Sequence, residues 1–188
     1  FSLYQREKPG SNKASSGLES IDLYQAWKKR KTAFTVSEAG DLNSEQNEYA
    51  LAFALDEKEI FFTSDRLGST GEAVYERTGL PYSDLYYSKW NARDKKWEVP
   101  VKVDESVNTS FNEGVSAFHQ GKGNADFLYY TQCNGRRRNE RNCKILVSKR
   151  IGADWQEPDT LAFCKDSLVN YGHPAISEDG KSMIFSAN

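Results

Sequence analysis

Two cysteines, Cys133 and Cys143, enclose the segment NGRRRNERN, at the end of one apolar run and the start of the next. Such a segment is typical of a hairpin loop, whose ends must lie close together for the two strands to pair. We therefore expect a disulfide between them; reduced thiols are the alternative. The disulfide would fit an oxidising compartment and would add roughly 2 to 3 kcal/mol to stability. The remaining cysteine, Cys164, is expected to be a buried, unpaired thiol.

The same loop concentrates positive charge in Arg136, Arg137, Arg138 and Arg141. These side chains could dock an acidic partner, and they are our candidate partner-binding residues. A solvated loop tip is the simpler alternative, because exposed runs of charge are common and Glu140 offsets part of this one.

The sequence contains no pattern that indicates catalysis. His119 and His173 occupy similar places near the first strand of successive repeats, without a nucleophile or carboxylate partner in evidence. The glycines of GSTG at 68–71 are followed by neither the lysine nor the helix of a phosphate-binding loop. No Cys-x-x-Cys pair with nearby histidines suggests zinc. We expect no catalytic residue, no metal and no cofactor, and the function to be non-enzymatic.

Composition excludes several other classes of function. The 188 residues carry a net charge of −2, which argues against binding to nucleic acid. No apolar run approaches the roughly 18 residues that cross a bilayer, so no membrane span is expected. Aromatic residues make up 13% of the chain, which favours strands. The strand-like pattern is already under way at Phe1, and the last hairpin has no third strand, so we expect a segment of a longer protein.

These residues are positioned by an internal repeat. GLESIDLYQAW aligns with GLPYSDLYYSKW, matching Gly17 to Gly79 and Asp22 to Asp84, and Asn47 matches Asn112, a period of 62 to 65 residues. A third copy begins at CKILVSKR. Its Trp155 falls where Trp97 lies in the second copy, and its Asn170 is matched to Asn108.

Alternating apolar residues bounded by turn residues predict four strands in each copy, in the second copy at residues 47–53, 57–64, 83–90 and 96–103. We expect no helix. DLYQAWKKRKTAF at 22–34 is interpreted as strand because its copy, 83–97, is strand interrupted by a turn at Asn91–Asp94. Trp27, Trp90, Trp97 and Trp155 are expected to fill the core between repeats.

Four short antiparallel strands recurring at this period are typical of a β-propeller. The predicted fold is all-β, a partial β-propeller of about three four-stranded antiparallel blades. Residues 1–45 would supply strands two to four of one blade. Residues 46–110 and 111–171 would each form a complete blade, and 172–188 the first two strands of another.

The hairpin HPAISEDGKSMIFSAN resembles the periplasmic WD-like, TolB-type propeller repeat of Bacteroidota, through His173, Pro174, Ser177, Asp179, Gly180 and Phe185. Within it, Asp179 and Gly180 should form the turn, with Gly180 at positive φ. FTSDRLGSTG, SDLYYSKW and KWEVPVKVDESVNTSFNE are similar to the propellers of OmpA-family proteins, most of all the PorE type of the type IX secretion system. NGRRRNERN and Lys144, at the place of Asp84, depart from that pattern.

The resemblance implies a binding or scaffold propeller in the periplasm, associated with the outer membrane. Its partners would be other proteins of the envelope or secretion machinery, and peptidoglycan would be held only by a separate OmpA-like domain. The alternative is a propeller accessory to a peptidase or glycan hydrolase whose catalytic domain lies elsewhere. Downstream sequence would distinguish the two.

Overall fold

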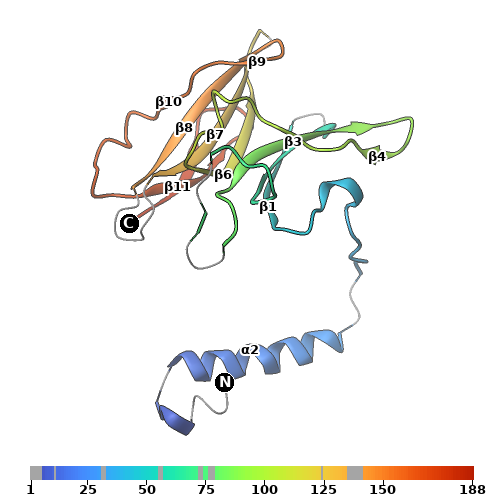
Figure 1. Ribbon diagram of the computed structural model, residues 1–188, viewed down its shortest axis with the longest axis vertical. Helices are drawn as coiled ribbons and strands as arrows, with labels where there is room; N and C mark the ends of the chain where they lie inside the picture. The colour runs from blue at the N-terminus through green and yellow to red at the C-terminus, as the bar shows by residue number, and fades with distance from the viewer. Residues whose placement is uncertain are drawn as a thin grey trace. The chain divides into compact units, whose positions relative to one another are not determined.

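The computed structural model describes residues 6–10, 12–30, 33–54, 57–71, 74–75, 79–123, 125–134 and 142–188 (Figure 1). The chain divides into two compact units, Phe1–Glu38 and Ala39–Asn188, which are treated separately. The first unit contains the helix α2 (Asn12–Lys28), and the second contains all of the described strands.

The strand prediction for residues 22–34 is wrong, because α2 covers most of that segment. Ala, Leu, Glu, Gln and Lys supply eight of the 17 residues of the helix, and these residue types favour the helical state. The aligned copy behaves differently because Asn91 accepts hydrogen bonds from the amides of Arg93 and Asp94 and so forms the predicted turn. Among the described residues, none before Glu48 belongs to a strand. Helix α2 is not long and apolar enough to cross a membrane.

The first sheet contains β1 (Glu48–Phe53), β2 (Glu59–Ser64), β3 (Asp84–Asn91), β4 (Lys96–Trp97) and β5 (Val101–Lys102). Strands β1, β2 and β3 form an antiparallel meander, and both β4 and β5 pair with β3. The predicted fourth strand is split in two. Pro100, which has no amide hydrogen to donate, lies between the pieces.

The second sheet repeats this plan with β6 (Asn112–Gln120), β7 (Ala125–Asn134), β8 (Asn142–Ile151), β9 (Asp154–Trp155) and β10 (Asp159–Thr160). Strands β9 and β10 both pair with β8, as β4 and β5 pair with β3. Arg150 pairs with Trp155 where Trp90 pairs with Trp97, so the predicted equivalence of the two tryptophans is confirmed.

The third sheet is the hairpin of β11 (Tyr171–Ile176) and β12 (Met183–Ala187). Gly180 has φ of 69° and donates its amide to the Ser177 carbonyl, so the predicted turn is confirmed. The Asp179 carboxylate accepts hydrogen bonds from the Ser177 hydroxyl and the Lys181 amide, which closes the loop.

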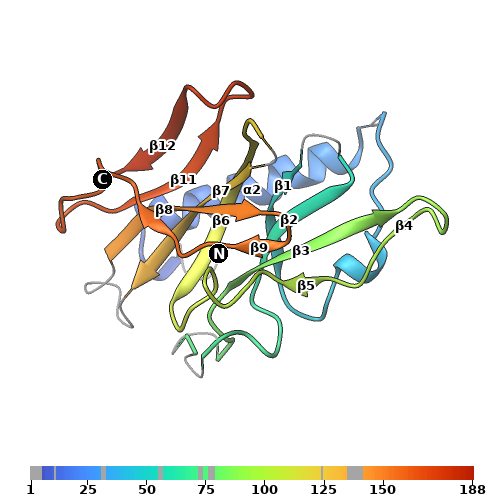
Figure 2. The same cartoon turned by 90° about the horizontal axis from the view of Figure 1, so that it is seen from above.

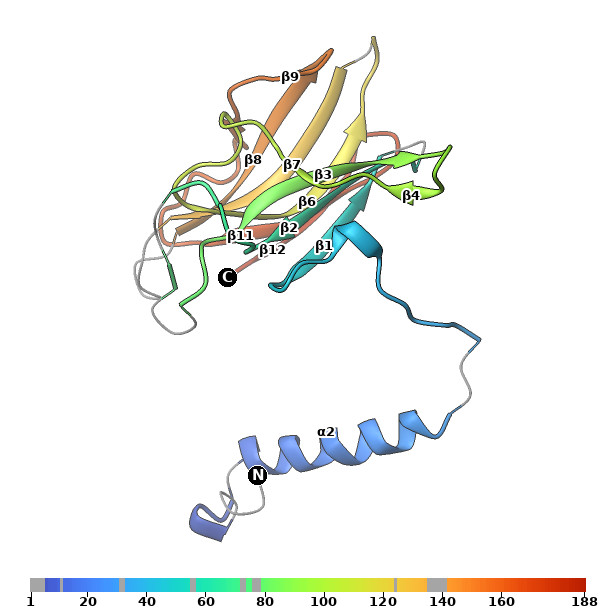
Figure 3. The same cartoon turned by 45° about the vertical axis from the view of Figure 1, so that its right-hand side comes forward.

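The first and second sheets pack face to face. Phe61, Leu85, Val103 and Val107 meet Leu128, Tyr130, Leu146 and Trp155 in the main hydrophobic cluster. A smaller cluster on the other face of the first sheet holds Leu42, Ile60, Phe62 and Tyr86. Figures 2 and 3 show β6 beside the first sheet, and β6 also contacts β11. The first strands of the three sheets are therefore neighbours in sequence order.

Each of these first strands carries the same irregularity. Ala50, Val115 and His173 have φ of 54°, 46° and 55°, each inside a register shift. Positive φ is a genuine outlier for a β-branched residue such as Val115. Two of these residues are each bound by a threonine hydroxyl of the preceding sheet. The Val115 amide donates to Thr63 Oγ1 at 3.0 Å, and the His173 amide donates to Thr131 Oγ1 at 2.9 Å.

Glycine precedes the bulge where the threonine approaches. A Cβ on Gly114 would lie 2.9 Å from Thr63 Cγ2, and one on Gly172 would lie 3.0 Å from Thr131 Cγ2. Tyr49 holds the corresponding place in the first sheet. The two junctions are thus built in the same way from different sequences.

The antiparallel, β-rich fold class is confirmed for Ala39–Asn188. Strands β1 to β5 lie within residues 46–110 and β6 to β10 within 111–171. The boundaries of the four blade segments remain a prediction.

Two of the predicted tryptophan positions need correction. Trp155, 8% exposed, lies in the main cluster, and Trp97 packs on the smaller one. Trp27 on α2 is 61% exposed and Trp90 37% exposed, so neither belongs to the core between the sheets.

Candidate binding cleft

A cleft of 780 Å³ opens between the first and second sheets, next to the main hydrophobic cluster. Side chains of β2 and β3 form one wall, and those of β6, β7, β8 and the turn before β9 form the other. The residues that the argument below uses are Glu59, Tyr87, Lys89, Phe118, Asp126 and Arg150.

Arg150 forms the floor of the cleft and joins the two sheets. Its Nη1 and Nη2 donate to Glu59 of β2 at 2.9 and 2.7 Å, and its Nε and Nη2 donate to Asp126 of β7 at 3.0 and 2.8 Å. Every second residue of β8 faces the first sheet, so Leu146 enters the cluster and Arg150 reaches Glu59. Such bidentate pairing is the geometry that guanidinium favours.

Aromatic rings surround the same guanidinium. Its Cζ lies 5.1 Å from the ring centre of Trp155 and 5.8 Å from those of Phe61 and Phe118. Burial alone would lower the pKa of Arg150, but the hydrogen bonds and charges of Glu59 and Asp126 outweigh it and raise the pKa above its ordinary value. Arg150 is therefore a permanent cation in a rigid setting.

Lys89 supplies a more accessible charge on the opposite wall. Lys89 is the neighbour of Glu59 in the register of β2 and β3, but the Glu59 carboxylate binds Arg150 instead. The Lys89 ammonium lies 5.9 Å from the centre of the Tyr87 ring. The cleft thus offers an exposed ammonium, aromatic edges and two carboxylates already bonded to arginine. This arrangement suits hydrogen bonding and charge contact with a polar ligand.

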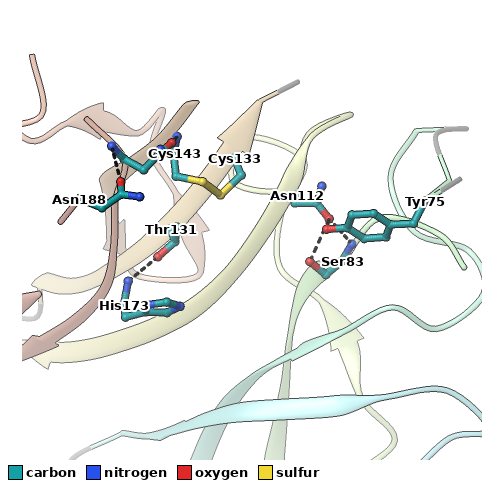
Figure 4. Close-up of a disulfide and its surroundings, with 9 residues drawn as sticks. Tyr75, Ser83, Asn112, Thr131, Cys133, Cys143, His173 and Asn188 are labelled. Atoms are coloured by element: carbon teal, nitrogen blue, oxygen red, sulfur yellow. Dashed lines mark hydrogen bonds between the residues drawn. A yellow bond between two sulfur atoms is a disulfide. The ribbon is translucent and has the colours of Figure 1, made fainter. Parts of the chain in front are cut away.

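The disulfide between Cys133 and Cys143 is confirmed, with Cα atoms 4.1 Å apart (Figure 4). It joins cross-strand partners of β7 and β8. Cys164 is a free, buried cysteine, as expected. The arginines predicted to bind a partner, Arg136, Arg137, Arg138 and Arg141, lie outside the described residues.

The motif residues of the last hairpin fall into two groups. Ser177, Asp179 and Gly180 form its turn, whereas His173 and Pro174 lie on β11 and Phe185 on β12. Phe185 stacks on Phe163 with ring centres 4.6 Å apart. None of them lines the cleft.

His119 and His173 both lie on the first strand of a sheet, β6 and β11, as predicted. Within those strands His173 occupies the bulge position of Val115, whereas His119 lies near the far end of β6. One predicted equivalence between repeats is wrong, because Asn170 corresponds to Asn112 and not to Asn108. Asn112 Oδ1 accepts the Ser83 amide (Figure 4), and Asn170 Oδ1 accepts the Cys143 amide, so each binds the start of the preceding sheet's third strand. The alignment of the drifted third copy was shifted by four residues there.

Sequence reasoning missed the residues of the cleft, including Glu59, Lys89, Asp126 and Arg150. Each resembles an ordinary charged residue at a strand end. The one available signal was that Arg150 lies on the same alternation of β8 as the buried residues Leu146 and Ser148, a place where an arginine needs an acidic partner. Among the described residues, no cluster of three or more His, Cys, Asp or Glu side chains is arranged to hold a metal.

Comparison with known proteins gives no match: no family description, no curated protein and no solved structure is similar to this chain.

Proposed function

We propose that this protein is a non-catalytic binding module of the bacterial cell envelope, with its sheets arranged as blades of a β-propeller. One observation carries the proposal: the hydrogen bond that the Val115 amide donates to the Thr63 hydroxyl recurs between the His173 amide and the Thr131 hydroxyl, at the same bulge. Successive blades of a propeller are joined by the same contacts, so a repeated junction favours a propeller. A β-sandwich does not require its sheets to be joined by a repeated contact.

The cleft is the surface proposed to bind the partner. Arg150 and its two carboxylates fix the relative position of the sheets that form the walls, and preorganised walls lower the entropic cost of binding. Lys89 is exposed at the mouth. The partner is proposed to be another protein of the envelope or secretion machinery, and the motif resemblance favours the type IX system.

A periplasmic location is part of the proposal. The Cys133–Cys143 disulfide supports it, because structural disulfides form and persist in oxidising compartments. From the resemblance to PorE-type proteins we further propose that the protein is associated with the outer membrane and that a separate domain binds peptidoglycan.

The test replaces Lys89 by a photo-crosslinking amino acid in the source bacterium. Glu178, exposed on the β11–β12 turn, carries the same probe as the control. We expect an envelope protein to be captured from Lys89 and not from Glu178, in the periplasmic fraction. Capture from both positions alike, or recovery of the protein in the cytoplasm with reduced thiols, would refute the proposal.

A further inference from the structure

The first compact unit differs from the rest of the chain in charge. Phe1–Glu38 contains seven basic and four acidic residues, a net charge of +3. Ala39–Asn188 contains 18 basic and 23 acidic residues, a net charge of −5. Such an asymmetry between two parts of a chain indicates that the basic part contacts an anionic surface.

Three exposed apolar side chains form a patch near the end of helix α2. Leu23, Tyr24 and Trp27 are 54%, 64% and 61% exposed. Trp27 follows Leu23 by four residues and Tyr24 by three, so the three side chains lie on one face of the helix. Large apolar side chains gathered on one exposed face are typical of an interaction surface. These three residues are called the apolar patch below.

Basic residues follow the apolar patch directly. Lys28 is the last residue of α2, and Lys29 and Arg30 come after it. The side chains of all three are exposed, and together they are called the basic run below.

The two acidic residues of α2 lie away from this end of the helix or from this face of it. Asp22 precedes Trp27 by five residues, which places it about 140° from Trp27 around the helix axis. Glu19 lies more than two turns before Trp27, roughly 12 Å along the axis. The end of α2 thus combines apolar and aromatic side chains with positive charge.

We propose that this end of α2 binds the surface of an anionic lipid membrane. Tryptophan and tyrosine are enriched at membrane–water interfaces, because their rings are apolar and carry one polar group. Lysine and arginine close to a membrane surface are attracted to anionic headgroups. Because α2 is not long and apolar enough to cross a membrane, the contact is with the surface.

The composition of this end of the helix favours lipid over an acidic protein. Lysine is depleted in the interfaces between proteins, and leucine is rare among the residues that contribute most to protein binding. Two of the three cations here are lysines, and Leu23 belongs to the apolar patch. An aromatic and aliphatic patch next to lysines matches the interfacial zone of a bilayer, where apolar and charged layers are adjacent.

The experiment measures co-sedimentation of the whole chain with lipid vesicles. Vesicles of phosphatidylcholine and phosphatidylglycerol in equal parts should bind the protein, and vesicles of phosphatidylcholine alone should bind it at least about tenfold more weakly. Added salt should weaken the binding to the anionic vesicles, because it screens exposed charges. Poly-glutamate serves as the probe for an acidic protein and should bind more weakly than the anionic vesicles.

Replacing the whole basic run by glutamine should weaken binding to the anionic vesicles at least about tenfold. The matched control replaces Arg93, Lys95 and Lys96 by glutamine, which removes the same charge from exposed residues at the β3–β4 turn. This control should bind as the unaltered protein does. Circular dichroism verifies that both variants are folded.

Trp27→Gln tests the apolar patch separately, because it leaves the charge unchanged. This variant should also bind the anionic vesicles more weakly than the unaltered protein does. Equal binding to both kinds of vesicle, or to neither, would overturn the proposal, and so would equal losses in the two glutamine variants. Unchanged binding of Trp27→Gln would refute the role of the patch at the membrane. Tighter binding to poly-glutamate than to the anionic vesicles would assign the surface to an acidic protein instead.

Discussion

The guanidinium of Arg150 and the carboxylate of Glu59, 91 positions apart in the chain, form two hydrogen bonds of 2.9 and 2.7 Å across the junction of the first two sheets. Replacing Arg150 by alanine would leave two carboxylates with no cation in a largely dry setting. We expect Arg150→Ala to lower the free energy of unfolding by about 3 to 5 kcal/mol, as measured by urea denaturation.

The exposed pair of Lys96 and Asp41, 3.8 Å apart, provides the control. Lys96→Ala should cost less than about 1 kcal/mol, because solvent screens that pair. Equal losses for the two variants would contradict a structural role for the buried ion pair.

The second prediction concerns the close approach at the first junction. Gly114→Ala should destabilise the protein by roughly 1 to 3 kcal/mol, since the new methyl group would meet Thr63 Cγ2. Adding Thr63→Ser removes that methyl group and retains the hydroxyl that binds the Val115 amide. The double variant should therefore unfold at a higher urea concentration than Gly114→Ala alone. If the unfolding free energies lost in Gly114→Ala and in Thr63→Ser simply added in the double variant, the two side chains would not be in contact, and the close approach would be refuted.

Thiol counting tests the third prediction. The chain has three cysteines, of which Cys164 is free and buried. Mass spectrometry after iodoacetamide treatment should find no modified thiol in the native protein, one after denaturation and three after denaturation with reduction. Replacing Cys133 and Cys143 together by alanine should cost roughly 2 to 3 kcal/mol. More than one modified thiol without reductant would contradict the disulfide.

The fourth prediction is a pH dependence from the buried acids. Burial raises the pKa of Asp84 and of Glu113, although hydrogen bonds to each act in the opposite direction. The folded state then holds protons that the unfolded state releases, so stability should increase as pH falls from 7 toward the unfolded pKa values near 4. Thermal unfolding measured at a series of pH values between 7 and about 4 should show this increase.

Asp84→Asn should weaken that dependence and stabilise the protein at pH 7. Glu48 gives the opposite sign, because burial raises its pKa but hydrogen bonds from Ser44 and Ser64 and the charge of Arg66 lower it overall. Glu48→Gln should therefore steepen the gain in stability on acidification. Identical pH profiles for both variants would argue against the assignment.

Local signals in the sequence predicted much of the sheet structure. Alternation at 57–64 and 83–90 located β2 and β3, and Asp179–Gly180 located the last turn. The helix was missed because similarity to 83–97 was given more weight than the helix propensity of residues 12–28. Secondary structure can be transferred from one repeat to another only where the turn residues are also matched. The first copy has no counterpart of the Asn91–Asp94 turn.

The cleft could not be predicted for a different reason. Glu59 and Arg150 meet only after two sheets pack, and no periodicity within either strand encodes that contact.

Strand β8 bears contacts to both neighbours at its two ends: Cys143 donates its amide to Asn170 at one end, and Arg150 holds Glu59 at the other. A tensile force applied between Glu59 and Asn170 would therefore load β8 along its length. The Cys133–Cys143 disulfide lies at the Asn170 end of β8 and ties the strand covalently to β7 at the point where such a load would enter.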